Sequence, residues 1–305
     1  MELCSKGDSF MFINEKIELS AFSPSEQKVV DFILKEKEHI SEWSTSQIAK
    51  ETYTSKSTLV RIAQKLGFSG WTSFRQAFHE EVTYLLKQAD AHDANLPFDK
   101  TDNNLEIASK LAHLKKEVID ETLHLSRNKD LNKAIHLISH ARTVHLFAAS
   151  NNLHNGREFA HNMKRIQKDV QLHDLHGEIH FDALLAEEDS CAIIISYSGG
   201  TLSLIKVAQI LRKKEIPIIA LTSLGDNPIS QLSQVTLRLS TKEKLYSKIG
   251  TYATDTSITF ILDLLYSIYF RQNYDYNLAF RQKTSQEIET ERFSYSPITE
   301  ETSEF

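Results

Sequence analysis

Hydroxyl-bearing residues and glycine crowd the stretch that follows a short apolar run at residues 191–195. The residues concerned are Ser196, Tyr197, Ser198, Gly199 and Thr201. Glycine at the carboxyl end of a buried strand allows a tight turn whose N–H groups point to the same side as the positive end of the next helix. Hydroxyl groups add hydrogen bonds without adding charge. The stretch therefore predicts a site for an anion such as a phosphate monoester, although an ordinary capped strand-to-helix turn would use similar residues.

Basic residues are concentrated between residues 50 and 75. This segment has a single acidic residue, although the whole chain carries a formal net charge of −6. A local excess of lysine and arginine marks a surface for phosphate contact, and the alternative is a solvated basic face. Arg61 would pair with guanine or hold a phosphate, whereas the lysines would contact the DNA backbone. The DNA-binding residues that we predict are Ser55, Lys56, Ser57, Thr58, Arg61 and Lys65.

Three histidines, His173, His176 and His180, lie close enough in sequence to suggest a metal site. No cysteine accompanies them and their segment is typical of a solvated loop, so we predict no metal there and no cofactor. Glu178 and His180 are the nearby choices for the general base of a sugar isomerase, but nothing in the sequence distinguishes them. Ser198 has no base at a recognisable spacing, so no catalytic residue is assigned.

Short apolar runs alternate with helical patterns in the second half of the chain. This alternation implies parallel strands joined by right-handed crossovers. We predict an α/β domain with a doubly wound, parallel, five-stranded sheet in flavodoxin-like order. The expected strands are residues 144–149, 170–172, 192–196, 216–221 and 235–239. The expected helices are residues 105–125, 129–140, 202–212 and 257–270.

The first part of the chain has helical patterns separated by short polar breaks. Ser23 and Ser44 are each followed three residues later by glutamate or glutamine, as in a capping box, and Ser55 is expected to cap a third helix. A helix-turn-helix also needs a small residue and apolar residues that fix the crossing of its two helices. The residues with that spacing are Ala49, Leu59 and Ile62. We therefore predict an all-α helix-turn-helix bundle.

The length of 305 residues and the hydrophobic fraction of 41% suit two domains. We predict a DNA-binding domain at 1–88, a polar linker at 89–104, a second domain at 105–282 and a poorly ordered tail at 283–305. No apolar run is long enough to cross a membrane and no signal sequence is evident, so we expect a cytoplasmic protein without membrane contact. Two cysteines do not suggest a disulfide framework.

Two segments of the first domain resemble the head of RpiR/MurR-type transcription regulators, which respond to phosphosugars. They are SPSEQKVVDFIL and QIAKETYTSKSTLVRIAQKLGFSGWTSFRQAF. Tyr53 is a departure, because the turn between the two helices usually carries glycine, and a left-handed backbone at tyrosine would cost about 1 kcal/mol. The segment of residues 196–201 resembles the signature of SIS domains, the sugar-isomerase modules that the family carries behind its head. This second resemblance extends over about residues 105–270.

The SIS resemblance implies a role for each residue of the signature. Ser196, Ser198 and Thr201 correspond to the hydroxyls that hold the phosphate, while Tyr197 and Gly199 offer backbone contacts. The resemblance thus agrees with the anion site that the residues themselves indicate.

The loop after the first strand departs from the family pattern. The family has roughly G-x-G-x-S there, whereas this chain reads AASNN at residues 148–152, so both glycines are absent. Side chains at these positions restrict the backbone and crowd the site. We expect Ser150, Asn151 and Asn152 to contact the ligand, with an altered specificity.

Taken together, these features predict a transcriptional regulator whose operator binding is modulated by a phosphorylated sugar. The sugar would bind at the ends of the first and third strands and change the spacing of two heads on double-stranded DNA. A two-fold operator favours a homodimer or homotetramer. Two alternatives stay open: an aldose-ketose isomerase of the SIS type, and a regulator whose SIS-like domain no longer binds small molecules. An isomerase has no need of a DNA-reading head, so we expect no enzyme activity.

Overall fold

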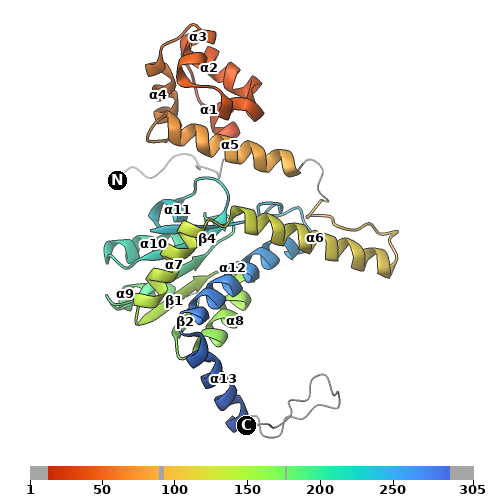
Figure 1. Cartoon of the computed structure of the whole chain (residues 1–305), viewed down its shortest axis with the longest axis vertical. Helices are drawn as coiled ribbons and strands as arrows, with labels where there is room; N and C mark the ends of the chain where they lie inside the picture. The colour runs from red at the N-terminus through yellow and green to blue at the C-terminus, as the bar shows by residue number, and fades with distance from the viewer. Residues whose placement is uncertain (1–12, 89–92, 176, 289–305) are drawn as a thin grey trace.

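The structure is a computed structural model that describes residues 13–88, 93–175 and 177–288 (Figure 1). It contains a helical head followed by an α/β sheet domain, and the two have separate hydrophobic cores. Figure 1 shows the head at one end of the molecule, with α5 (Trp71–Gln88) on the side of the head that faces the sheet domain. The predicted division into an all-α part and an α/β part is confirmed.

The head consists of helices joined by short turns. Its elements are α1 (Ile13–Leu19), α2 (Pro24–Lys35), the 3-10 helix η1 (Lys37–Glu42), α3 (Thr45–Glu51), α4 (Lys56–Lys65) and α5. Ser23 and Ser44 both form the predicted capping boxes, with Glu26 and Gln47 respectively. The prediction for Ser55 is wrong in one respect. It occupies the N-cap position of α4, but its hydroxyl bonds to the hydroxyls of Ser57 and Thr58 and not to a backbone N–H group.

The crossing of α3 and α4 is fixed by the residues that the sequence analysis selects. Ala49, Leu59 and Ile62 are all buried, and they belong to one core cluster with Phe74 and Phe78 of α5. Close packing of a small residue against branched ones leaves one preferred crossing geometry. The helix-turn-helix prediction is therefore confirmed.

The sheet domain has five parallel strands. They are β1 (Thr143–Ala148), β2 (Asp169–His173), β3 (Cys191–Ile195), β4 (Ile218–Ser223) and β5 (Val235–Leu239). Their order is β2-β1-β3-β4-β5, the flavodoxin-like order. Only β4 differs appreciably from its predicted bounds, because the apolar run at residues 216–221 begins in the turn that leads into the strand.

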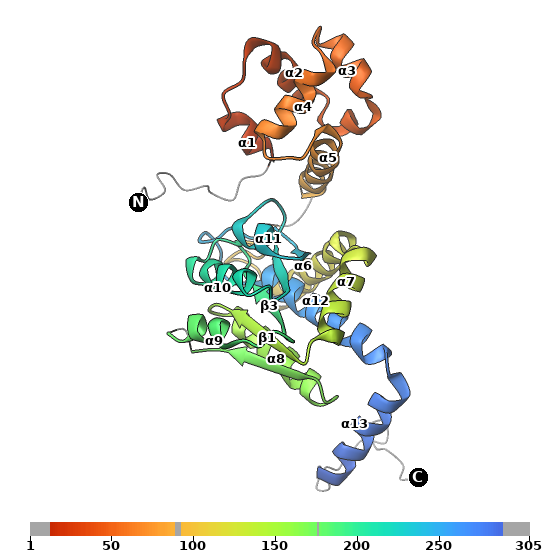
Figure 2. The ribbon, with the colours of Figure 1, turned by 90° about the vertical axis from the view of Figure 1, so that its left-hand side faces the viewer.

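Helices cover both faces of this sheet, as Figure 2 shows for α10 and α11 on one side and α7 and α12 on the other. Alternate strand residues point to opposite faces. One face packs against α7 (Asn128–His140), α8 (Asn152–Lys164) and α12 (Tyr252–Arg271). The other face packs against α9 (Ile179–Leu185), α10 (Leu202–Lys213) and α11 (Pro228–Leu232). Every helix of the described residues is too short or too polar to cross a lipid bilayer.

The segments predicted as linker and tail are partly ordered. Within the described part of residues 89–104, Ala94 and Asn95 are buried, and Ala94 packs with Leu114 and Val118 of α6 (Asn104–Leu125). This segment is therefore docked on the sheet domain where an exposed linker was expected. Helix α13 (Tyr274–Ile288) continues through residues 283–288, and the rest of the predicted tail lies outside the described residues. The exact domain boundaries stay a prediction.

Tyr53, in the turn between α3 and α4, has a φ of 54°. The residue is 91% exposed, so little packing offsets the strain of the left-handed backbone. We expect Tyr53→Gly to be more stable than Tyr53→Ala by about 1 kcal/mol, because both variants remove the side chain but only glycine relieves the strain. Chemical denaturation followed by the helical circular dichroism signal would measure the difference. Equal stabilities of the two variants would show that the turn is not left-handed in solution.

Candidate anion site and nucleic-acid interface

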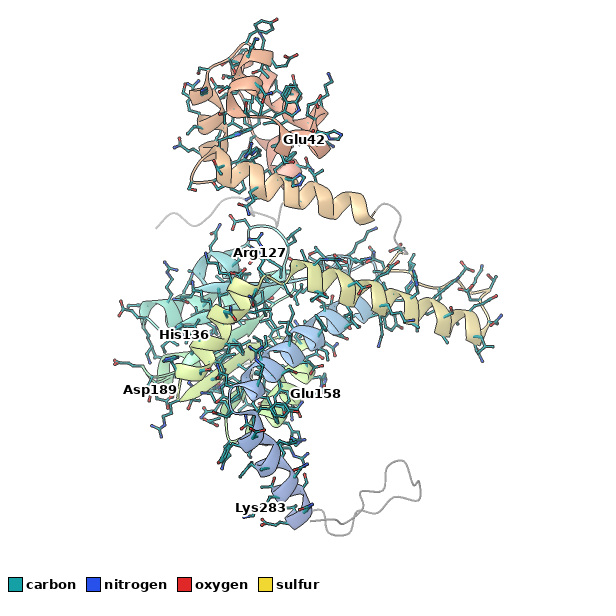
Figure 3. The ribbon with its side chains drawn as sticks, in the orientation of Figure 1. Glu42, Arg127, His136, Glu158, Asp189 and Lys283 are labelled. Carbon is teal, nitrogen blue, oxygen red and sulfur yellow. The ribbon has the colours of Figure 1, made fainter. Side chains whose placement is uncertain are left out.

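The predicted anion-binding turn follows β3 and leads into α10. Figure 3 shows Asp189, which precedes β3, at the margin of the sheet domain away from α6, so the turn lies at the opposite end of the strand. Ser196 is buried, and its Oγ lies 3.3 Å from Oγ1 of Thr201. Thr201 is the N-cap residue of α10. Among the described residues, its side chain makes no capping hydrogen bond to the first N–H groups of this helix. The two hydroxyls therefore border a helix end with unsatisfied N–H groups, which attracts anions.

Gly199 is the residue that makes the turn possible. Its φ is 64°, and a Cβ atom at this position would lie 2.1 Å from Oδ1 of Asn227. Asn227 is itself fixed, because it caps α11 and donates to Oγ1 of Thr222 over 3.0 Å. Glycine is thus required both by the backbone conformation and by the space beside it. Ser198 supports the turn by accepting from the N–H group of Gly200 over 3.3 Å.

Tyr197 points away from the predicted ligand. Its hydroxyl donates to the carbonyl of Glu243 over 2.6 Å and accepts from the N–H group of Glu243 over 3.1 Å. Burial raises the pKa of Tyr197, so the hydroxyl stays neutral. Its carbonyl accepts from the N–H group of Ser223, so a backbone contact to a ligand would have to come from the Tyr197 N–H group. The side chain instead ties the turn to the segment after β5.

The loop after β1 lies beside this turn, because Ala148 pairs with Ile195 in neighbouring parallel strands. Ser150 is exposed and has a φ of 53°, so a non-glycine residue takes a left-handed conformation where the family has glycine. Asn152 begins α8 and is half-buried. Asn151 is directed elsewhere: its amide donates to Asp255 of α12 over 2.9 Å. Ser150 and Asn152 therefore fit the predicted ligand contacts better than the Asn151 side chain.

Glu243 is a residue of this region that the sequence analysis missed. Its carboxylate is fully buried and accepts from the N–H group of Ala253 over 2.6 Å, from Oγ1 of Thr254 over 2.6 Å and from Nζ of Lys248 over 2.9 Å. A carboxylate at the amino end of a helix is stabilised by the helix dipole, and here it receives the first N–H groups of α12. A single glutamate in a polar loop carries no sequence pattern that would have identified it.

The exposed face of α4 carries part of the predicted DNA contact. Lys56, Ser57 and Arg61 are exposed, and the Arg61 guanidinium lies 3.3 Å from Oγ1 of Thr58. Val60 and Gln64 share this face and were missed, because neither is basic. Glutamine suits adenine and an apolar group suits the thymine methyl, so both belong to the set of possible base contacts.

Two of the predicted DNA contacts do not fit their surroundings. Thr58 is buried, and its hydroxyl bonds to Ser55 within the helix end, so it positions neighbours and does not face DNA. Lys65 forms an ion pair with Glu26 of α2 over 3.2 Å and lies over the ring of Phe22. Arg75, which contributes to the basic segment, donates to the carbonyl of Trp43. The basic surface is therefore narrower than the sequence suggests.

Two of the clustered histidines, His173 and His180, are held by polar contacts within the sheet domain. His173 lies 2.9 Å from Nδ1 of His145 and 3.0 Å from Oδ2 of Asp182, and burial lowers the pKa of His173. His180 lies 3.2 Å from the carbonyl of Ser203, and His176 falls outside the described residues. The residues that the structure describes contain no cluster able to hold a metal ion.

Cys191 at the start of β3 is likewise a core residue. Burial raises the pKa of its thiol to about 12, so the thiolate is not accessible near neutral pH. The site region offers hydroxyls, amides and helix N–H groups as hydrogen-bonding partners.

Two family models match the chain. The model of the helix-turn-helix domain of the rpiR family matches residues 11–84, and the SIS domain model matches residues 137–267. The second match spans all five strands and the turn at residues 196–201. The first includes α3 and α4 with their exposed basic face.

Solved structures of similar fold include both regulators and isomerases. The NanR protein of Vibrio vulnificus, complexed with ManNAc-6P, is 20% identical over 92% of this chain and 98% of its own, with a TM-score of 0.57. The sugar isomerase domain of an RpiR transcription factor from Sphaerobacter thermophilus is 12% identical over 59% of this chain and 98% of its own, with a TM-score of 0.53. A putative sugar-phosphate isomerase from Listeria monocytogenes is 12% identical over 58% of this chain and 98% of its own, with a TM-score of 0.50.

These matches agree with the architecture and with the resemblance seen in the sequence. An α-helical head with the rpiR-family helix-turn-helix precedes a five-stranded parallel domain with the SIS signature, and the NanR protein is similar in fold over 92% of this chain. The chain is an RpiR-type transcriptional regulator with an N-terminal helix-turn-helix domain and a C-terminal SIS domain.

Proposed function

We propose that the protein binds double-stranded operator DNA through the exposed face of α4, and that a phosphorylated sugar bound at residues 196–201 modulates this binding. The observation that carries the proposal is the turn itself. Buried and half-buried hydroxyls border the open amino end of α10, in a chain whose other domain presents Arg61 and Lys56 on a helix-turn-helix. Such a turn recognises the phosphoryl group, and the neighbouring loops recognise the sugar.

The neighbouring loop suggests how the sugar would be selected. Ser150 and Asn152 follow β1 and stand beside the turn, where they can bond to sugar hydroxyls. The NanR structure holds ManNAc-6P, which supports a phosphorylated sugar as the class of ligand. At 20% identity, this support extends to the class and not to the identity of the sugar.

A regulator fits the site better than an isomerase does. Isomerisation needs a free general base over the sugar carbons. Glu178 is exposed at the start of α9, His180 faces the carbonyl of Ser203, and the Glu243 carboxylate already accepts from several donors. We therefore assign binding without turnover.

Assembly and location follow from DNA recognition. A helix-turn-helix reads one half-site, so two heads are needed on a two-fold operator, and SIS domains offer a second contact between copies. We propose a homodimer or homotetramer that acts in the cytoplasm. The effector would act by favouring one spacing of the heads over another.

The first prediction of this proposal concerns the ligand. Hexose and amino-sugar phosphates, including ManNAc-6P, are tested in a thermal-shift panel with inorganic phosphate as comparison. A ligand at about 100 times its Kd stabilises the native state by about 2.7 kcal/mol. Ser198→Ala should reduce this stabilisation, whereas Ser139→Ala should retain it, because that hydroxyl lies on α7 and donates to Gln272.

The outcomes of the ligand panel separate the alternatives. Turnover of a stabilising sugar phosphate, followed by the conversion of aldose to ketose, would favour an isomerase. No stabilisation by any member would contradict sugar-phosphate sensing and favour a regulator whose SIS domain binds no small molecule.

The second prediction concerns DNA. Arg61→Ala should weaken binding to a duplex selected from a random pool by about 1 to 3 kcal/mol, which is about 5- to 150-fold in Kd. Lys65→Ala removes the same charge from the same helix but breaks an ion pair with Glu26, so its loss of affinity should be smaller. Fluorescence anisotropy would measure both, with circular dichroism as the check on folding. A larger loss for Lys65→Ala would show that α4 contacts DNA by a different face.

A further inference from the structure

The segment between β5 and α12, residues 240–250, touches three functional parts of the chain at once. We call it the bridging loop. It contacts the predicted anion turn through Tyr197, the interdomain segment (residues 93–103) through Asn95, and α6 through an ion pair between Lys242 and Glu117. A loop with these contacts is placed to transmit a change from one part to another.

The contact with the anion turn is made by Tyr197. The Tyr197 hydroxyl both donates to the carbonyl and accepts from the N–H group of Glu243, at 2.6 Å and 3.1 Å. Lys248 of the same loop lies over the tyrosine ring and forms an ion pair with the Glu243 carboxylate. Because the backbone of Tyr197 belongs to the turn, a ligand that shifts this backbone also shifts the Glu243 backbone.

The contact with the interdomain segment is made by Asn95, which is buried. Its Oδ1 accepts from the N–H group of Lys244 over 2.7 Å, and its carbonyl accepts from the N–H group of Ile249 over 3.1 Å. The backbone N–H group and Nδ2 of Asn95 donate to Oδ1 of Asp93 over 2.9 Å and 2.7 Å, and these two bonds hold the pKa of Asp93 below its ordinary value. Asn95 therefore satisfies two backbone N–H groups of the bridging loop. These bonds hold the interdomain segment against the sheet domain.

The bridging loop is anchored by two residues near its start, Lys242 and Glu243. Glu243 is anchored at the amino end of α12 by Ala253 and Thr254, and Lys242 is 9% exposed between Glu117 and Glu121 of α6. A buried carboxylate that is separated from its hydrogen-bond and ion-pair partners is strongly destabilising, so we expect Glu243 and its partners to move together. Displacement of one end is passed to the other.

We propose that the bridging loop couples the anion turn to the interdomain segment, with Tyr197 and Asn95 as positioning residues at its two ends. The proposal rests on the proposed function, since it names the route by which a bound phosphosugar alters the heads. Occupation of the turn and docking of Asn95 favour each other, and by linkage each strengthens the other to the same degree. Release of Asn95 frees residues 93–96 from the sheet domain and so changes the spacing of the heads.

A second connection between the domains offers a competing route. Lys16 of α1 lies 3.6 Å from Asp226, which adjoins the Asn227 that packs on Gly199. This ion pair is partly exposed, and such pairs contribute little. The bridging loop makes several hydrogen bonds with buried or partly buried groups, so it is the stronger route.

The test measures the Kd for a selected duplex with and without ManNAc-6P or the most stabilising sugar phosphate of the panel. For the wild-type protein the ratio of the two Kd values should be about 5- to 150-fold. Asn95→Ala should bring the ratio close to one while the variant still binds DNA and is still stabilised by the ligand. Tyr197→Phe should lower the ratio as well, because it removes the hydroxyl that bonds to the backbone of Glu243. Asn103→Ala is the matched control, because it removes the N-cap of α6 and lowers stability but does not touch the loop.

A second readout does not depend on the ligand. In Tyr197→Phe, hydrogen exchange of the amides at residues 94–96 should be faster than in the wild type, although the lost hydroxyl contacts none of them. Unchanged exchange in that variant would overturn the coupling route even if sensing is real. A ratio retained by Asn95→Ala but lost in Lys16→Ala would assign the coupling to the ion pair. If the sugar phosphate does not change the Kd for DNA in the wild-type protein but exchange is faster in Tyr197→Phe, the proposed sensing is contradicted. The structural link between Tyr197 and residues 94–96 would then still be supported.

Discussion

The structure of the sheet domain depends on one buried charge, the carboxylate of Glu243 at the amino end of α12. An unpaired charge in this place would cost several kcal/mol, and the backbone N–H groups, Thr254 and Lys248 remove that cost only if all are in position. The loop that carries Glu243 is therefore held in one conformation. Tyr197 and Asn95 both bind to its backbone, so the anion turn and the interdomain segment take their positions from the same anchor.

Much of the fold could be predicted because it depends on local signals. The five apolar runs, the capping serines at residues 23 and 44 and the spacing of Ala49, Leu59 and Ile62 act within a few turns of chain, and the structure contains each of them. Burial on both faces of a parallel sheet leaves continuous apolar strands that are easily recognised. The turn at residues 196–201 could also be placed, because strand, glycine and helix follow one another directly in the sequence.

The rest depended on contacts between residues far apart in the chain. Lys65 is turned to Glu26 of another helix, and Asn95 is held by Lys244 and Ile249 of the other end of its domain. From the sequence alone, a polar segment such as residues 93–103 is taken for a linker. Asparagine and aspartate are typical of exposed loops, but they also occur in buried turns where hydrogen bonds satisfy their polar groups. Asn151 is a similar case, since its bond to Asp255 takes it away from the site that its position in the loop suggested.

The head and the sheet domain share no buried apolar residue among the parts of the chain that the structure describes. A rigid-body reorientation of one relative to the other would thus expose no hydrophobic core, and its free-energy change would come mainly from polar groups that water can also satisfy. A binding event at one domain needs to supply only a small fraction of the folding free energy to select an orientation of the other. Because each domain has its own core, the domains can change their relative orientation without disrupting the contacts that stabilise either one. The protein can therefore respond to a ligand and stay folded.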